Sequence, residues 1–187
     1  MKTLIVYYSY SQNNAKLARL LQKKLGCDLL RIEELRERTR GTIFLDVIFN
    51  RLPPIKLTHT DLKEYNQVIF IAPVWAARIA TPLKTFIVSE KLNITNYAFI
   101  TICGGAKGQA EKITKQLTKL TNRKPEVVVE LSLNDLFTQS KRNEGYKPSY
   151  QLADEDLAFF DAKITDFLSR SAMPMEKGWQ VKYEYGD

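Results

Sequence analysis

Residue types that commonly carry catalytic or metal-binding chemistry are scarce in this 187-residue chain. It has one histidine, His59, and two cysteines, Cys27 and Cys103, which lie far apart and form no metal-ligand pattern with it. No Ser/His/Asp or Cys/His set is visible, so we assign no catalytic residue and no metal ligand. No apolar run approaches the length of a membrane span, and the amino terminus does not resemble a signal peptide. We therefore expect a reduced, cytoplasmic protein that does not enter a membrane.

The length and composition fit one folded domain. The hydrophobic fraction of 44% is enough for a core, which argues against a disordered chain. We expect the domain to cover residues 1–170 and a carboxyl-terminal tail to cover residues 171–187. In the tail, Trp179–Tyr183 alternates between apolar and polar residues, which fits an added edge strand, surface packing or pairing between chains.

Apolar runs alternate with helical patterns along the chain. The runs Leu4–Tyr8, Val68–Ala72 and Tyr97–Ile102 are continuous and β-rich. Such runs are typical of strands that are buried on both faces of a parallel sheet. Two further candidates, Asp28–Ile32 and Val127–Leu131, carry charge and fit the sheet edges, where charge discourages stray pairing.

The helical patterns fall between these strands. The first stripe, Leu17–Leu25, ends at Gly26, which fits a C-terminal cap. Thr81–Pro82 fits an N-cap followed by proline at the first helical position. Further stripes run over Ala110–Leu120 and, after an acidic first turn, over residues 154–168. This order predicts an α/β fold: a doubly wound, five-stranded parallel sheet of strand order 2-1-3-4-5 with helices on both faces.

Two connections are unusually long for a compact domain. Residues 36–61 are expected to hold a short helix around Thr42–Asn50, followed by the breaker Pro53–Pro54. Ser132–Tyr150 is polar and shows no strong pattern. Connections of this length are often functional or disordered.

The strand order also predicts where a ligand binds. Ligands of open α/β sheets bind outside the carboxyl ends of the strands, at the point where the winding reverses. Here that point lies between the first and third strands, so the loops after Tyr8, Ala72 and Ile102 should converge. The candidate cofactor-binding residues in these loops are Ser9, Tyr10, Ser11, Gln12, Asn13, Asn14, Pro73, Val74, Trp75, Ala76, Ala77, Arg78, Cys103, Gly104 and Gly105.

Each loop has a ligand-binding interpretation and a plain structural one. The first loop leads into a helix N-terminus that suits a phosphate, but Asn13 or Asn14 could instead cap that helix. Trp75 could stack on a planar ring or cover the end of the sheet. The glycines after Cys103 could admit a ligand close to the backbone or only form a turn, with Cys103 as a small buried hydrophobe. Together, a phosphate site, an aromatic wall and a glycine-rich edge describe a mononucleotide with a large ring, and FMN fits.

At these residues the sequence resembles the flavodoxin-like family, from Lys2 to about Arg170. The stretch "SYSQNN" is similar to the hydroxyl-rich loop that binds the FMN phosphate in that family. The stretch "EYNQVIFIAPVWAARIATPLKTFI" is similar to a bacterial branch whose loop reads Pro-Val-Trp-Ala-Gly-Arg-Ile-Ala-Pro-Pro, and "ITICGG" resembles its third loop. Gln12 and Ala77 stand where the family usually has glycine, and Asn14 stands where it usually has threonine. If Gln12 needs a positive φ, we expect backbone strain there.

The resemblance implies an FMN-binding protein that acts in electron transfer or as a flavin-dependent oxidoreductase on a small acceptor. The candidate ring loops contain Arg78 and Lys107 but no Asp or Glu. A cation beside the flavin stabilises an anionic reduced ring, so we expect a higher potential than in acidic flavodoxins. A redox partner or NAD(P)H would supply or take the electrons, and a homodimer that pairs around the ligand crevice is an open alternative.

Two other classes of function remain open. A flavodoxin-fold binding or regulatory protein without FMN is compatible with Gln12. The net charge of +7 and the basic face of Lys112, Lys115 and Lys119 fit nucleic acid. Nucleic acid is the weakest of these readings, because such faces are usually solvated and no aromatic residues interleave with the lysines.

Overall fold

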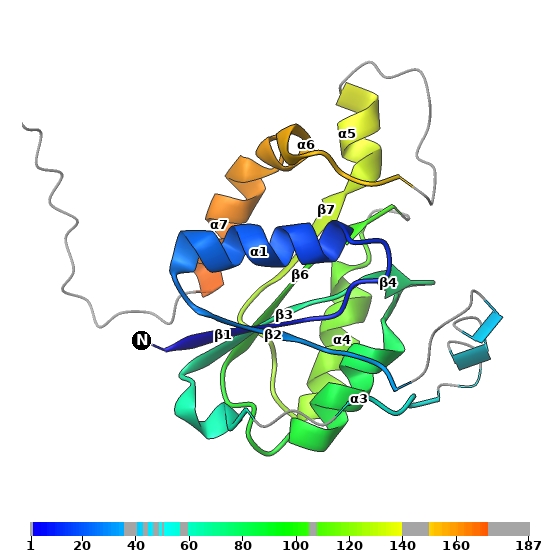
Figure 1. Cartoon of the computed structure of the whole chain (residues 1–187), viewed down its shortest axis with the longest axis vertical. Helices are drawn as coiled ribbons and strands as arrows, with labels where there is room; N and C mark the ends of the chain where they lie inside the picture. Colours follow the sequence, from blue (N-terminus) through cyan, green and yellow to red (C-terminus); the bar gives the residue numbers. More distant parts are fainter. Residues whose placement is uncertain are drawn as a thin grey trace, which may run out of the picture.

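The computed structural model describes residues 2–35, 41–42, 45–46, 49, 51–56, 60–104, 108–139 and 150–171. In this part of the chain, one sheet contains the strands β1 (Thr3–Tyr7), β2 (Asp28–Arg31), β3 (Gln67–Ile71), β6 (Tyr97–Cys103) and β7 (Val128–Ser132). All its neighbouring strands are parallel, in the order β2-β1-β3-β6-β7. Counted along the chain this is the order 2-1-3-4-5, so the predicted topology is confirmed (Figure 1).

Helices cover both faces of the sheet (Figure 1). The helices are α1 (Asn13–Leu25), η1 (Leu62–Glu64, a 3₁₀ turn), α3 (Thr81–Glu90), α4 (Ala110–Thr121), α5 (Leu133–Gln139), α6 (Asp154–Ala158) and α7 (Asp161–Ser171). One core lies under α1, α5 and α7, and the other lies under α3 and α4. None of the described helices combines the length and the apolar composition needed to cross a bilayer.

The pattern of the strands explains this arrangement. Every residue of β1, β3 and β6 is buried, as the continuous apolar runs predicted. Alternate residues enter opposite cores, so Ile69 packs under α1 and α7 while Phe70 packs under α3 and α4. The Phe70 ring meets Phe86 and Tyr97 edge to face, at centroid distances of 6.4 and 5.7 Å. The edge strand β2 is exposed at both of its ends, as its charges indicated.

Of three predicted helix features, one matches the structure and two differ from it in detail. Gly26 caps α1 with φ 57°, as predicted. The N-cap of α3 is Ala80, so Thr81 is the first helical residue rather than the cap. The predicted stripe over residues 154–168 forms two helices. At the end of α6 the Phe160 N–H donates to the Leu157 carbonyl oxygen, at 3.0 Å, and this bond spans three residues instead of the four of an α-helix.

The two long connections were only partly understood from the sequence. The region 132–150 was predicted to lack a pattern, but α5 begins directly after β7 and buries Leu133 and Leu136. Between β2 and η1, residues 41–42 and 45–46 are helical and the Phe49 N–H donates to the Leu45 carbonyl oxygen, which fits the short helix predicted there. The tail beyond residue 171, with its predicted Trp179–Tyr183 strand, lies outside the described residues, as do residues 140–149.

A small hairpin that the sequence did not predict follows β3. Its antiparallel strands, β4 (Val74–Trp75) and β5 (Arg78–Ile79), are joined by Ala76 and Ala77 at φ 49° and 58°. Two successive positive φ angles define a type I′ turn, which normally takes Asn-Gly. Alanine in the left-handed region is strained, and this turn carries the strain at two neighbouring positions.

We expect Ala77→Gly to raise the free energy of unfolding by about 1 kcal/mol, because glycine adopts a positive φ without a Cβ clash. Urea unfolding would measure the change. Ala162→Gly is the matched control: Ala162 is an exposed residue in the first turn of α7, where the same substitution should destabilise, by at most about 1 kcal/mol. A destabilisation of similar size by both variants would contradict the strain at Ala77.

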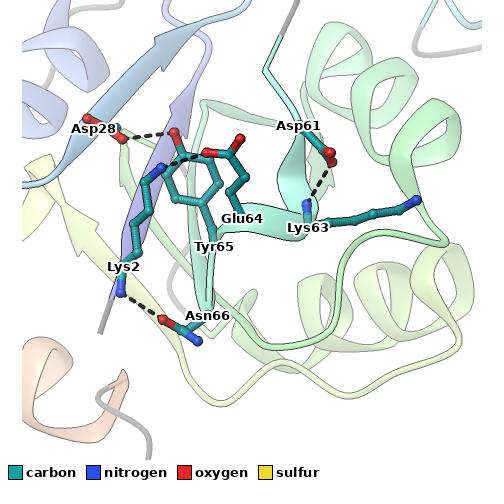
Figure 2. Close-up of polar contacts among 7 residues, drawn as sticks. All are labelled: Lys2, Asp28, Asp61, Lys63, Glu64, Tyr65 and Asn66. Carbon is teal, nitrogen blue, oxygen red and sulfur yellow. Dashed lines mark hydrogen bonds and ion pairs between the residues drawn. The ribbon is translucent and has the colours of Figure 1, made fainter.

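The amino end of the sheet is closed by paired polar groups (Figure 2). The Lys2 ammonium contacts the Glu64 carboxylate at 2.8 Å, and the Lys2 backbone N–H donates to the Asn66 side-chain oxygen. The Tyr65 hydroxyl donates to Asp28 at 2.8 Å. These contacts fasten η1 to the start of β1 and β2, so this end of the sheet serves structure.

Candidate functional site

The predicted loops meet at the opposite, carboxyl end of the sheet. β1 and β6 both pair with β3, and the Tyr8 N–H donates to the Ile71 carbonyl oxygen at 2.9 Å. The loops that follow β1 and β3 therefore start side by side. β6 runs through Cys103, one residue further than predicted, so Cys103 is a buried strand residue rather than part of a loop.

The first loop presents an uncapped helix N-terminus. Gln12 is the N-cap of α1 with φ 69° and ψ −13°, and it makes no side-chain capping hydrogen bond. The condition under which we expected backbone strain at this position, a positive φ, is therefore met. The first turn of α1 holds no acidic residue, which leaves its backbone N–H groups and the helix dipole unopposed. Beside it, the Ser9 hydroxyl oxygen is buried with no hydrogen-bond partner.

Asn13 and Asn14 do not cap α1, so the plain structural reading of the loop is wrong. The Asn14 side chain accepts from the Ile102 N–H at 2.9 Å and donates to the Ile102 carbonyl oxygen at 3.2 Å. The Asn13 side chain accepts from the Leu152 N–H at 3.0 Å and donates to the Tyr150 carbonyl oxygen at 2.9 Å. Asn14 thus fastens the loop to β6, and Asn13 fastens it to the segment that precedes α6, so both side-chain amides are already engaged within the protein.

The hairpin forms an aromatic wall beside the first loop. The half-buried Trp75 ring meets the Tyr8 ring edge to face, with centroids 6.1 Å apart and planes at 88°. The Tyr8 hydroxyl donates to the Glu34 carboxylate at 2.8 Å. Sequence reasoning missed both Tyr8, which it counted as the end of a strand, and Glu34, which follows a different strand. The structure therefore brings one carboxylate close to this wall, although the three predicted loops contain none.

Contacts at both of its ends hold the hairpin in place. At its base, the Ala80 N–H donates to the Pro73 carbonyl oxygen at 3.0 Å. At its turn, the Gln116 side chain of α4 donates to the Ala77 carbonyl oxygen at 2.7 Å and accepts from the Ile79 N–H at 3.4 Å. Gln116 lies on the amphipathic helix that the sequence suggested only as a basic surface, so nothing in the pattern marked it as a support for Trp75.

The loop after β6 is anchored from β7 and α5. The Gly104 carbonyl oxygen accepts a 3.4 Å hydrogen bond from the Asn134 side chain. The Glu130 carboxylate accepts hydrogen bonds from the backbone of Ala110 and Gln109, where α4 begins. Burial raises the pKa of Glu130 above its ordinary value, and these backbone donors oppose the shift. Gly105, predicted to lie at the site, falls outside the described residues.

The remaining predicted site residues lie at the surface of these loops. Tyr10 is 44% exposed, Ser11 is half-buried, and Arg78 is exposed on β5. Val74 is half-buried and packs against the core under α3 and α4, and Ala76 is exposed in the turn. The described ranges contain no group of three or more His, Cys, Asp or Glu side chains that could hold a metal ion.

A separate groove of about 760 Å³ lies between α1 and the α6–α7 pair. It is lined by Lys16, Arg19, Leu20, Lys23, Lys24, Asp154, Leu157, Ala158 and Asp161. Two of its cations already have partners: Lys24 pairs with Asp161 at 2.9 Å, and Lys16 donates to the Leu152 carbonyl oxygen. This groove runs along the side of α1 and contains none of the predicted site residues.

The parallel strand order, 2-1-3-4-5 along the chain, is that of the flavodoxin-like class of α/β folds. No family model and no curated protein matches the sequence. Solved structures do match: a flavoprotein from Lactobacillus acidophilus NCFM in complex with FMN has a TM-score of 0.61 and 20% identity, and the match covers 74% of this chain and 97% of that one. A putative flavoprotein from Bacteroides eggerthii has a TM-score of 0.63 and 18% identity, with 86% and 96% covered. The chain thus has the flavodoxin-like fold.

The apo form of the Lactobacillus acidophilus flavoprotein, solved by NMR, also matches. Its TM-score is 0.54 and its identity 25%, with 69% of this chain and 89% of that one covered. The fold is therefore shared with the same flavoprotein both with FMN and without it.

Proposed function

We propose that this protein binds FMN and acts in electron transfer, or as a flavin-dependent oxidoreductase on a small acceptor. One observation carries the proposal: the partnerless Ser9 hydroxyl lies beside the uncapped N-terminus of α1. A buried hydroxyl without a partner is costly, and a phosphate at a helix N-terminus would satisfy it together with the free backbone N–H groups. The structural match to an FMN complex supports the same assignment.

The residues at the carboxyl edge fit the parts of FMN. Ser9, Ser11 and the backbone of the first turn of α1 would hold the phosphate. Trp75, which packs against Tyr8, would supply a wall for the flavin ring. Gly104 has no side chain, so its backbone could lie close to that ring. Bound flavin supplies the electron transfer itself, whereas the chain supplies placement and electrostatics.

A titration that compares FMN with riboflavin tests the proposal. We expect the purified protein to quench FMN fluorescence saturably and to bind riboflavin, which lacks the phosphate, at least about tenfold more weakly, since one hydrogen bond to a charged group contributes about 1.5–3 kcal/mol. Equal affinity for both flavins would remove the phosphate from the assignment. No binding of either would leave a flavodoxin-fold protein without FMN, the alternative that the strained and exposed Gln12 favours.

The ring environment predicts the redox potential. Arg78 lies directly opposite Trp75 in the hairpin pairing, so their side chains share one face of this two-stranded unit. We expect the bound FMN to have a higher midpoint potential than the FMN of acidic flavodoxins, and Arg78→Glu to lower it, because a cation stabilises the anionic reduced ring. A redox titration measures both. Lys63→Glu, at the opposite end of the sheet, is the control with the same change of charge (Figure 2). An equal shift of the midpoint potential in this control would contradict a local effect of Arg78.

A further inference from the structure

Four cations from three elements gather around Gln116, on the side of the hairpin that faces α3 and α4. They form what we call the hairpin patch: Arg78 of β5, Lys84 of α3, and Lys112 and Lys119 of α4. Gln116 bonds the residues on both sides of Arg78, which holds Arg78 next to α4. Lys112 and Lys119 lie four residues before and three residues after Gln116, so they share its face of the helix.

Lys84 joins the patch from the neighbouring helix. α3 packs against α4, and Lys84 interacts electrostatically with both Arg78 and Lys119. Burial of Lys84 is the main cause that lowers its pKa, and the two neighbouring cations lower the pKa further. Arg78 and Lys119 are therefore both close enough to Lys84 for their charges to act on its ammonium group.

Lys112 and Lys119 of the patch differ from several other cations of the surface, which form ion pairs. Within the described residues, neither Lys112 nor Lys119 forms an ion pair, whereas Lys115, which lies between them on the same basic face of α4, pairs with Glu111 at 2.6 Å. In the groove on the other face of the sheet, Lys24 is neutralised by Asp161. A cluster of like charges attracts and orients a partner of opposite charge.

The patch is continuous with the proposed flavin site. Arg78 belongs to it and also lies opposite Trp75, which forms the wall of that site. Trp75 is half-buried and so leaves an aromatic surface at the rim of the basic cluster. Aromatic and arginine side chains are the residue types that most often dominate protein–protein binding. A protein docked on the patch would thus lie beside the edge where the flavin is expected.

We propose that the hairpin patch docks an acidic protein that exchanges electrons with the bound flavin; this inference rests on the proposed FMN-binding function. The occupant is a protein rather than a nucleic acid because the basic face of α4 has no interleaved aromatic residues and the patch adjoins a redox site. The polarity is the reverse of that of an acidic flavodoxin, whose carboxylates would meet a basic partner.

Electron transfer to two model acceptors tests the docking. The FMN-loaded protein, reduced under anaerobic conditions, would be mixed with an acidic b-type cytochrome or a basic c-type cytochrome, and haem reduction followed by stopped flow. One electron leaves the reduced flavin and reduces ferric to ferrous haem. We expect the second-order rate constant with the acidic cytochrome to fall steeply as salt is added, and that with the basic cytochrome to rise or stay flat.

Charge reversal locates the docking site. The double variant Lys84→Glu/Lys119→Glu should slow the reaction with the acidic cytochrome by about tenfold or more at low salt, because steering by a charged patch changes on-rates by about 10–10³. The control Arg19→Glu/Lys23→Glu makes the same change of net charge in the groove beside α1 and should have little effect. Equal losses in both double variants would reduce the effect to net charge and overturn the proposal.

A binding measurement separates this proposal from the proposed function. FMN loading is confirmed first from the flavin absorbance, and calorimetry then measures binding of the acidic cytochrome with and without flavin. Loaded protein that neither binds the cytochrome nor shows a salt-dependent rate overturns the docking while the function stands. Failure to load FMN sinks the function, and cytochrome binding that is lost in Lys84→Glu/Lys119→Glu would still show docking. If that variant instead loses binding of a DNA oligonucleotide and keeps the cytochrome, the patch serves nucleic acid and the proposal is wrong.

Discussion

Replacing Asn14 with alanine is expected to lower the free energy of unfolding by about 2–4 kcal/mol, the largest stability loss that we predict for a single residue of the site. Asn14 is 2% exposed, and its amide bonds both the N–H and the carbonyl oxygen of Ile102. The loss leaves two backbone groups of β6 buried without partners, each at a cost of about 1–3 kcal/mol. Chemical denaturation monitored by far-UV circular dichroism measures the change.

Asn93→Ala is the matched control for Asn14→Ala. The Asn93 side chain donates to the half-buried Glu90 carboxylate near the end of α3, a local contact between residues that are close in sequence. Its removal should cost less than about 1 kcal/mol. Similar losses in the two variants would mean that the clamp between the first loop and β6 does not stabilise the fold beyond an ordinary surface contact.

Ser9→Ala/Ser11→Ala is expected to weaken FMN binding by about 100-fold or more while it leaves riboflavin binding unchanged. Each hydroxyl would contribute one hydrogen bond to a charged phosphate, about 1.5–3 kcal/mol, and each 1.4 kcal/mol is a factor of ten in affinity. Stability should change little or even rise, because the Ser9 hydroxyl is buried and has no partner in the protein. Fluorescence titration gives the two affinities, and urea unfolding of the flavin-free variant gives the stability.

Ser89→Ala, which removes a hydroxyl from α3, controls for a general effect of losing serine. It should change neither affinity. A parallel loss of FMN and riboflavin in Ser9→Ala/Ser11→Ala would indicate that the loop has changed shape, and unchanged FMN affinity would mean that the phosphate is held elsewhere.

The sequence predicted the sheet correctly because its signals are local. Continuous apolar runs at β1, β3 and β6 and charged edge runs at β2 and β7 indicate the strand order without knowledge of any contact. Gly26 is a local signal as well, since a glycine directly after an apolar helical stripe is typical of a C-terminal cap. The convergence of the loops follows from topology alone.

The details that define the site depend on contacts between residues far apart in the sequence. Nothing in the pattern showed that Asn14 bonds Ile102, that Gln116 supports the hairpin turn, or that Glu34 meets Tyr8. The hairpin was missed because β4 and β5 have two residues each, too few for a period to be visible. The helix α5 was missed because it has only seven residues, too few for a helical period to be visible in the sequence.

The two asparagine clamps have a consequence for the order of folding. Asn14 joins the first loop to a strand 88 residues later, and Asn13 joins it to a segment 137 residues later. Closing such long loops costs chain entropy before any contact is gained, so contacts of this kind form late. The loop at the start of α1 is therefore among the first parts of the chain to be synthesised and among the last to reach its final shape. A cofactor that needs this shape binds only a fully folded chain, so flavin uptake would report the completion of folding rather than assist its beginning.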